Sequence, residues 1–228
     1  MFDILLLDLD DTILDFHMQE KVAIEKTLSG AGIPPTEENC ALYSRINDGF
    51  WKRLEKGEVT RQQILYGRFE ELFAQLGINR DSKETALAYM GNLAEGHYYL
   101  PGALEAVQSL CKHYRLFLVS NGTTCVQEKR LKSADLCKYF EGVFISQDIG
   151  VNKPNKGFFD YCFAHIADFD PQKALIVGDS LSSDILGGKN AGIATCWVNP
   201  TGRKYSRELP PDYEIENLAQ LEAYLETL

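Results

Sequence analysis

The chain has 228 residues, of which 45% are hydrophobic and 25% charged, enough apolar material for one or two buried cores. A formal net charge of −10 repels nucleic acid and anionic lipid, so neither is expected as the main partner. No apolar run approaches the roughly 20 residues that span a bilayer, and the first residues lack a secretory pattern, so a cytoplasmic protein is expected.

Five short apolar runs, mostly separated by helical patterns, predict the strands of a parallel sheet. The runs are continuously apolar rather than alternating, as expected of strands that are covered on both faces. They span residues 4–7, 115–119, 143–145, 174–177 and 194–198. We therefore predict an α/β fold with a doubly wound, Rossmann-like parallel sheet.

A long helical interval separates the first run from the second. Its clearest helical patterns span residues 41–56, 60–76 and 82–98, with Pro34-Pro35 and Gly77 marking breaks. No strand is expected between residues 16 and 99. The sequence thus predicts an α/β domain made of residues 1–15 and 100–228, and an inserted helical domain of residues 16–99.

Carboxylates follow the first strand directly, in the segment DLDDT. Asp8 and Asp10 lie two residues apart, so an extended chain points them to the same side. Two carboxylates this close repel each other unless a cation lies between them or one keeps its proton. The alternative is a solvated turn or a helix N-cap, which is the better interpretation of Asp11.

A hydroxyl and a lysine follow the second and third strands. Ser120 and Asn121, in VSNG, combine a hydroxyl with backbone N–H groups, which suits a phosphate, although a turn with a capping serine fits equally well. Lys153, in NKP, precedes a proline that favours extended backbone, and its amine could neutralise phosphate charge. Taken alone, Lys153 is better interpreted as a solvated surface lysine.

Two further carboxylates follow the fourth strand, in GDSLSSD. Asp179 stands at the strand end and Asp184 in the first turn of a helix that is expected to end near Gly192. The helix dipole alone could account for Asp184. In open parallel sheets ligands bind beyond the carboxyl ends of the strands, so these groups are expected at one site.

The segments DLDDT, VSNG, NKP and GDSLSSD, in this order, resemble the four motifs of the haloacid dehalogenase superfamily. The resemblance implies a strand order of 5-4-1-2-3, in which the first, second and fourth strands are adjacent. It also implies that the inserted helices form the helical cap of that superfamily.

The resemblance assigns roles to the matching residues. Asp8 would be the nucleophile that forms an aspartyl-phosphate, and Asp10 the acid and base. Ser120, the Asn121 amide and Lys153 would hold the phosphoryl oxygens. The ligands of a Mg²⁺ ion would be the carboxylates of Asp8, Asp179 and Asp184, the last directly or through water, and the backbone carbonyl of Asp10.

The dehalogenases of the superfamily resemble this chain in fold and nucleophile but lack an acid at the position of Asp10. The presence of Asp10 therefore favours hydrolysis of a small-molecule phosphate monoester over dehalogenation. The opening segment and the length of the helical insertion are similar to those of bacterial pyrimidine 5′-nucleotidases, and sugar-phosphate or phosphoglycolate phosphatases are the alternative.

Five aromatic side chains could stack on a base or fill the helical core instead: Phe16, His17, Phe50, Trp51 and Tyr66. Arg45 and Arg53 are expected on a solvated helix face, and a monomer and a dimer remain equally open.

A phospho-accepting signalling receiver is the alternative from another functional class. Such receivers also combine a doubly wound sheet with clustered aspartates, a hydroxyl and a lysine. They lack the long helical insertion and the second acid, so the enzyme is favoured. The six cysteines show no metal-binding or C-x-x-C spacing and are expected to be reduced thiols.

Overall fold

The computed structural model describes residues 2–227, which divide into two compact units. Met1–Phe16 and His97–Leu228 form the unit that contains the sheet, and His17–Gly96 form a helical unit. The sequence placed the corresponding boundaries after residues 15 and 99. Among the described helices, none is both long and apolar enough to cross a membrane.

The sheet has six parallel strands in the order β3-β2-β1-β4-β5-β6. The strands are β1 (Ile4–Leu7), β2 (Arg115–Ser120), β3 (Gly142–Ile145), β4 (Ala174–Gly178), β5 (Ala194–Val198) and β6 (Tyr213–Ile215). The five predicted strands and their order are confirmed. The sequence missed β6 because a three-residue run carries too little pattern to distinguish it from a loop.

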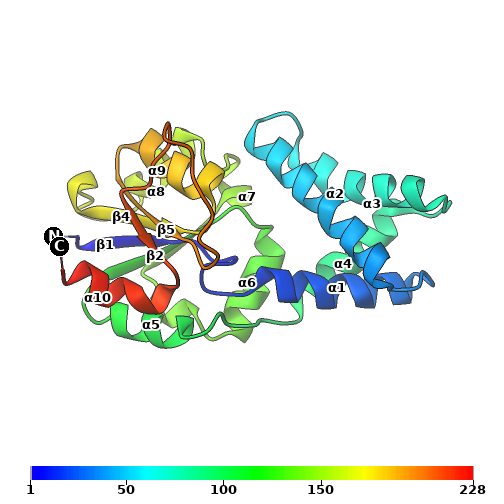
Figure 1. Cartoon of the computed structure of the whole chain (residues 1–228), viewed down its shortest axis with the longest axis horizontal. Helices are drawn as coiled ribbons and strands as arrows, with labels where there is room; N and C mark the ends of the chain where they lie inside the picture. The colour runs from blue at the N-terminus through cyan, green and yellow to red at the C-terminus, as the bar shows by residue number, and fades with distance from the viewer. Residues whose placement is uncertain (1, 228) are drawn as a thin grey trace. The chain divides into compact units, whose positions relative to one another are not determined.

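Helices cover both faces of the sheet, as the unbroken apolar strands predicted (Figure 1). The helices of this unit are α5 (Ala103–Leu110), α6 (Thr124–Ser133), α7 (Ser146–Ile149), α8 (Lys156–Ala164), α9 (Leu186–Ala191) and α10 (Leu221–Leu225). Leu5 and Leu7 of β1 pack with α5 and α10 on one face, and Ile4 and Leu6 pack with α8 on the other. The two buried faces hold β1 rigidly in the centre of the sheet.

The described end of the chain forms two short helical segments in succession. A 3₁₀ turn, Leu218–Gln220, precedes the short α10. Leu218, Leu221 and Leu225 are buried against the sheet. Leu228 lies outside the described residues.

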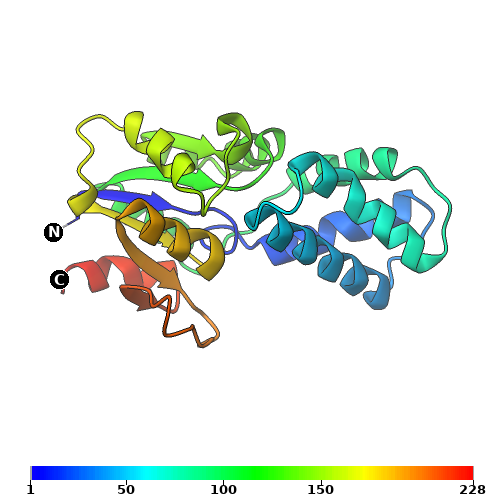
Figure 2. The same cartoon turned by 90° about the horizontal axis from the view of Figure 1, so that it is seen from above.

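The helical unit consists of α1 (Phe16–Gly30), α2 (Glu37–Glu55), α3 (Arg61–Leu76) and α4 (Ser82–Ala94) (Figure 2). Three fully buried rings form the centre of its core, since Tyr43, Phe69 and Tyr89 have centroids 5.1 to 5.6 Å apart. Aromatic side chains at helical spacing therefore build much of this unit's interior.

Capping groups explain where these helices begin and end. Thr60 and Gln63 form a reciprocal capping box at the start of α3, which matches the predicted pattern over residues 60–76. The start of α2 lies earlier than predicted because Thr36 Oγ1 accepts a hydrogen bond of 3.2 Å from the Asn39 N–H. The end of α4 also lies earlier, at Ala94 rather than residue 98. There the Gln19 side chain of α1 donates to the carbonyl of Leu93 at 2.8 Å, a contact between distant segments.

All six cysteines are free thiols. Cys40, Cys162 and Cys196 are buried. Burial raises the pKa of Cys162 and of Cys196 to about 12, so both thiols are poor nucleophiles.

Candidate active site

The predicted motif residues gather at the carboxyl ends of three neighbouring strands. Asp8 follows β1, Ser120 ends β2, and Asp179 follows β4. The β1 strand pairs in register with both neighbours, so Leu7 is level with Leu118 and Val177. The strand order therefore brings segments more than 100 residues apart to one rim.

Three carboxylates converge at this rim. Asp8, Asp179 and Asp184 each offer an oxygen atom, and these atoms lie within 4.8 Å of one another. Asp184 comes from a π-helical turn, Leu181–Ile185, and its side chain folds back against β4. A Cβ atom on Gly178 would lie 2.2 Å from Asp184 Oδ2, so only glycine at this position admits the carboxylate.

Lys153 lies among these carboxylates and is 1% exposed, which excludes the surface-lysine interpretation. Its Nζ donates to Asp8 Oδ1 at 2.6 Å, to Asp184 Oδ1 at 2.7 Å and to the Val119 carbonyl at 2.8 Å. Burial lowers the pKa of Lys153, but Asp184 and Asp8 outweigh it and raise that pKa above its ordinary value. The ammonium group is therefore charged and has all three protons committed to protein oxygens.

Burial makes the carboxylate cluster costly without a further cation. It raises the pKa of Asp8 to about 8, since desolvation and the neighbouring Asp184 outweigh the attraction of Lys153. Burial also raises the pKa of Asp179 well above its ordinary range, and Asp184 and Asp8 add to the effect. An all-oxygen donor set of this kind fits a hard divalent ion such as Mg²⁺.

We expect the stabilisation by Mg²⁺ to increase with pH. A carboxyl group whose pKa is raised by folding stabilises the fold at low pH, and this contribution is lost as pH rises through the folded pKa, about 8 for Asp8. Mg²⁺ binds the ionised carboxylates and so offsets the loss. Thermal unfolding with and without Mg²⁺, at matched ionic strength, should give a larger shift of Tm at about pH 8 than at about pH 5. Equal shifts at both values would contradict the assignment of these carboxylates to a metal site.

Ser120 is 1% exposed, and its hydroxyl oxygen accepts two hydrogen bonds. The donors are the Gly122 N–H at 3.0 Å and Gln127 Nε2 at 2.9 Å. With both lone pairs engaged, the hydroxyl has its proton to donate, which suits a phosphoryl oxygen.

The Asn121 side chain joins the second and third motifs. Its Nδ2 donates to the Lys153 carbonyl at 2.9 Å, and its Oδ1 accepts from the Lys153 N–H at 2.9 Å. Nδ2 also lies 3.2 Å from Ser183 Oγ, in the turn that carries Asp184. The side-chain amide of Asn121 thus fixes the backbone of Lys153. The predicted contact of the Asn121 amide with a phosphoryl oxygen concerns its backbone N–H, a different group, and stays a prediction.

The carboxylate of Asp10 lies outside the three-carboxylate cluster and has its own partners. Asp10 Oδ1 accepts from Arg130 at 2.5 Å, and Oδ2 accepts from Gln127 at 2.7 Å. The sequence interpretation missed both α6 residues. The available signal was a pair of polar residues three positions apart, and therefore on one helix face, in the helix directly after VSNG.

Asp11 acts as a cap, as the alternative interpretation of that residue held. Its Oδ1 accepts a hydrogen bond of 2.9 Å from the Phe16 N–H at the start of α1. Its φ of 56° lies in the left-handed region, which aspartate tolerates better than most residues. Asp8, Asp10 and Asp11 therefore have three different surroundings within four residues.

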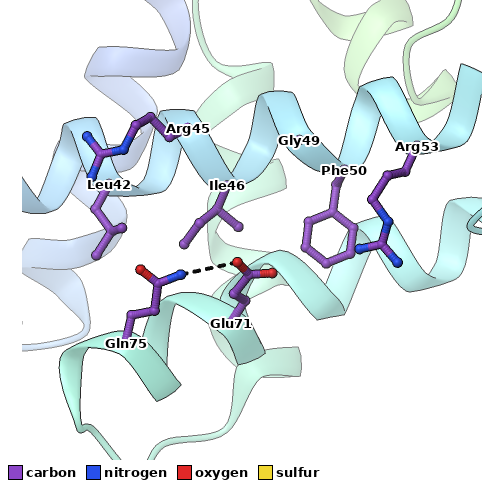
Figure 3. A pocket seen from close by; sticks show the side chains of 8 residues that line it. All are labelled: Leu42, Arg45, Ile46, Gly49, Phe50, Arg53, Glu71 and Gln75. Atoms are coloured by element: carbon purple, nitrogen blue, oxygen red, sulfur yellow. Dashed lines mark hydrogen bonds between the residues drawn. The ribbon is translucent and has the colours of Figure 1, made fainter.

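The helical unit has a hollow of about 320 Å³ between α2 and α3 (Figure 3). Arg45 and Arg53 stand near its two ends, with Glu71 and Gln75 of α3 opposite. Phe50 is 8% exposed, and a Cβ on Gly67 would meet its ring at 3.0 Å. The Phe50 ring is thus part of the helix packing, whereas both arginines are exposed, as expected of a solvated face.

The other aromatic candidates are only partly covered or are exposed. Trp51 and Tyr66 are half-buried, with the guanidinium of Arg61 and the ammonium of Lys83 near their respective rings. Phe16 is half-buried, with Arg130 5.8 Å from its ring centroid, and His17 is exposed. Of these five side chains Phe50 is the buried one, so stacking on a base stays a prediction for the other four.

Comparison with known proteins identifies the family. A model of the haloacid dehalogenase-like hydrolases matches residues 2–192. The chain belongs to this family. The predicted family and fold are thereby confirmed, and so is the prediction of an enzyme rather than a signalling receiver.

The relatives agree with this assignment. The HAD-hydrolase YfnB of Bacillus subtilis is 39% identical over 95% of this chain and 92% of its own. Its crystal structure, bound to magnesium, covers 98% of both chains with a TM-score of 0.94. The pyrimidine 5′-nucleotidases PynA of Streptococcus pneumoniae and YjjG of Escherichia coli are 36% and 31% identical. The alignments cover 96% and 98% of this chain, and 93% and 98% of theirs.

Proposed function

We propose that this hydrolase is a Mg²⁺-dependent phosphatase that cleaves nucleoside 5′-monophosphates, with a preference for pyrimidine nucleotides. The observation that carries the proposal is the position of Asp8 at the end of β1. Its carboxylate lies close to those of Asp179 and Asp184 and accepts a hydrogen bond from Lys153. A second acid, Asp10, follows Asp8 two residues later in the chain. A nucleophile, a cation site and a nearby acid are the parts that phosphoryl transfer requires.

In the proposed first step, an Asp8 carboxylate oxygen attacks phosphorus. The bond from phosphorus to the ester oxygen breaks, and that oxygen takes a proton from Asp10. In the second step, Asp10 accepts a proton from a water molecule that attacks the aspartyl-phosphate, which releases phosphate and regenerates Asp8. Ser120 would donate to a phosphoryl oxygen throughout.

Mg²⁺ would be held by the carboxylates of Asp8, Asp179 and Asp184 and by the backbone carbonyl of Asp10. When bound, it supplies positive charge that neutralises the phosphoryl oxygens and the carboxylates. Lys153 adds a second, fixed positive charge beside Asp8. The high pKa of Asp8 agrees with a site whose charge balance includes a bound cation.

The nucleotide preference is supported by the relatives, since PynA and YjjG are pyrimidine 5′-nucleotidases that align with nearly the whole chain. The presence of Asp10 supports ester hydrolysis over dehalogenation, because an alkoxide leaving group needs a proton and a halide does not.

A panel of phosphate esters tests the proposal. The purified protein with Mg²⁺ should release phosphate from UMP, dUMP and dTMP with a higher kcat/KM than from AMP, phosphoglycolate or hexose phosphates. The Asp8→Asn variant, purified in parallel, measures any contaminating phosphatase. A clear preference for phosphoglycolate or a hexose phosphate would overturn the nucleotidase assignment while retaining the phosphatase, and release from none of them would overturn both.

A further inference from the structure

Arg130 is a fully buried arginine of α6 that forms an ion pair with Asp10. Its side chain is 0% exposed, whereas that of Asp10 is 27% exposed. The Nη1 atom lies 2.5 Å from Asp10 Oδ1 and also donates to Gln127 Oε1 at 2.8 Å. One charged group is thus withdrawn from water while its partner remains at the rim of the site.

Gln127 completes the hold on the same carboxylate. Its Nε2 donates to Asp10 Oδ2 at 2.7 Å and to Ser120 Oγ at 2.9 Å. Both oxygens of Asp10 are therefore bound from one helix face, and the same glutamine joins Asp10 to the serine proposed to hold phosphate. Gly122 leaves room for this arrangement, because a Cβ there would lie 2.3 Å from Gln127 Nε2.

Burying this guanidinium is costly, and the structure offers little compensation apart from Asp10. Nε and Nη2 of Arg130 are buried without a hydrogen-bond partner among the described residues. The ring of Phe16 lies nearby, 5.8 Å from the guanidinium carbon. A buried charge with unsatisfied donors destabilises the fold, so an apolar residue would serve this position better if packing were its only purpose.

We propose that Arg130, acting with Gln127, is a positioning residue that directs the Asp10 carboxyl group toward the oxygen of the leaving group. The inference rests on the proposed phosphatase function. In the step concerned, the bond from phosphorus to the ester oxygen breaks, its electron pair passes to that oxygen, and the Asp10 proton completes the alcohol. A carboxyl group held through both oxygens has one orientation, and proton transfer requires that orientation to within a few tenths of an ångström.

The requirement should depend on the leaving group. An alkoxide, as in a nucleoside 5′-monophosphate, is a poor leaving group and needs the proton as the bond breaks. A nitrophenolate is stable without a proton, so its release from p-nitrophenyl phosphate needs little help from Asp10. A change that only loosened the fold would slow both reactions alike.

The test measures the first turnover of each ester with enzyme in excess, so that the later attack of water on the aspartyl-phosphate does not affect the measured rate. Wild type, Arg130→Met, Arg130→Lys and Gln127→Met are each mixed with UMP or with p-nitrophenyl phosphate and saturating Mg²⁺. Arg115→Met is the matched control, because Arg115 also pairs with a carboxylate, that of Glu141, at a surface position of the same unit. Circular dichroism and thermal unfolding verify that each variant is folded.

For Arg130→Met we expect release of uridine to slow by about 100-fold and release of nitrophenolate by less than about tenfold, with little change in the enzyme concentration that gives half the maximal rate. Arg130→Lys, which keeps the charge but loses the fork of donors, should lie between wild type and Arg130→Met. If Arg130→Met proves unstable, Gln127→Met should show the same selective loss at a smaller magnitude, about tenfold. Arg115→Met should match the wild type on both esters.

Equal losses on the two esters, or no loss on UMP, in the folded variants would overturn the role of Arg130 while leaving the phosphatase in place. A wild type that releases neither product would overturn the proposed function and this inference together.

Discussion

Replacing Asp8 by asparagine is expected to abolish turnover of every phosphate ester, with a loss of about 1,000-fold or more in kcat. Asparagine keeps the shape of the side chain but lacks the anionic oxygen that would bond to phosphorus. Its amide would also weaken the site for a divalent ion, since one of the three converging carboxylates is lost. The expected effect therefore exceeds that of removing a residue that only binds substrate.

The fold should tolerate this change. Burial raises the pKa of Asp8 to about 8, so a neutral amide avoids the cost of a desolvated negative charge. Lys153 would still donate to Asp184 and to the Val119 carbonyl. In Mg²⁺-free buffer the Tm of Asp8→Asn should accordingly equal or exceed that of the wild type.

Asp11→Asn provides the matched control for this experiment. Asparagine tolerates the left-handed backbone of residue 11 and can still accept the hydrogen bond from the Phe16 N–H. Its activity should stay within a few-fold of the wild type. Near-normal turnover in Asp8→Asn, measured as phosphate release under conditions where Asp11→Asn is also active, would eliminate Asp8 as the nucleophile.

Replacing Lys153 by methionine is expected to destabilise the Mg²⁺-free protein by about 3–5 kcal/mol, the usual cost of leaving buried charges without their partner. Methionine fills a similar volume, so the loss comes mainly from the uncompensated carboxylates of Asp8 and Asp184. Saturating Mg²⁺ should restore part of this stability, because the ion supplies positive charge to the same carboxylates. Activity with Mg²⁺ should still fall at least about tenfold, since the charge beside the phosphoryl group is lost.

Urea unfolding with and without Mg²⁺ measures the effect. Lys156→Met is the control, because Lys156 also forms an ion pair, with Asp160, but at an exposed position on α8. Exposed pairs of this kind contribute little, so both its stability and its activity should remain close to those of the wild type. If Lys153→Met were as stable as Lys156→Met in Mg²⁺-free buffer, the lysine would have no part in balancing the cluster.

Local sequence was sufficient for most of the sheet and for the site residues nearest the strands. The run at residues 4–7 is too uniformly apolar for an exposed strand, and Asp8 follows it without a turn, which places a carboxylate at the sheet's edge. The helical pattern over residues 60–76 and the break at Gly77 predicted α3, because both signals lie within the helix or next to it.

Long-range contacts account for what the sequence interpretation missed. The end of α4 depends on Gln19, more than 70 residues earlier in the chain. The partners of Asp10 come from α6, more than 110 residues later. The spacing of Gln127 and Arg130 places them on one helix face but does not identify the side chain that they contact. Likewise, the sequence alone favours an ordinary surface lysine at position 153, whereas in the structure Lys153 is buried between two carboxylates.

By itself, the amino-acid sequence determined the fold class, the family and the order of the acids, the hydroxyl and the lysine, because each follows a strand whose pattern is local. Only the tertiary structure decided which groups meet: Asp8 with Asp184 at Lys153, and Asp10 with Arg130 and Gln127. The physical reason is that strand pairing and helix packing set the distances between residues that are far apart in the sequence. The residues next to each of them in the chain do not indicate which distant side chain it will contact. Charge balance within the site is therefore a property of the fold.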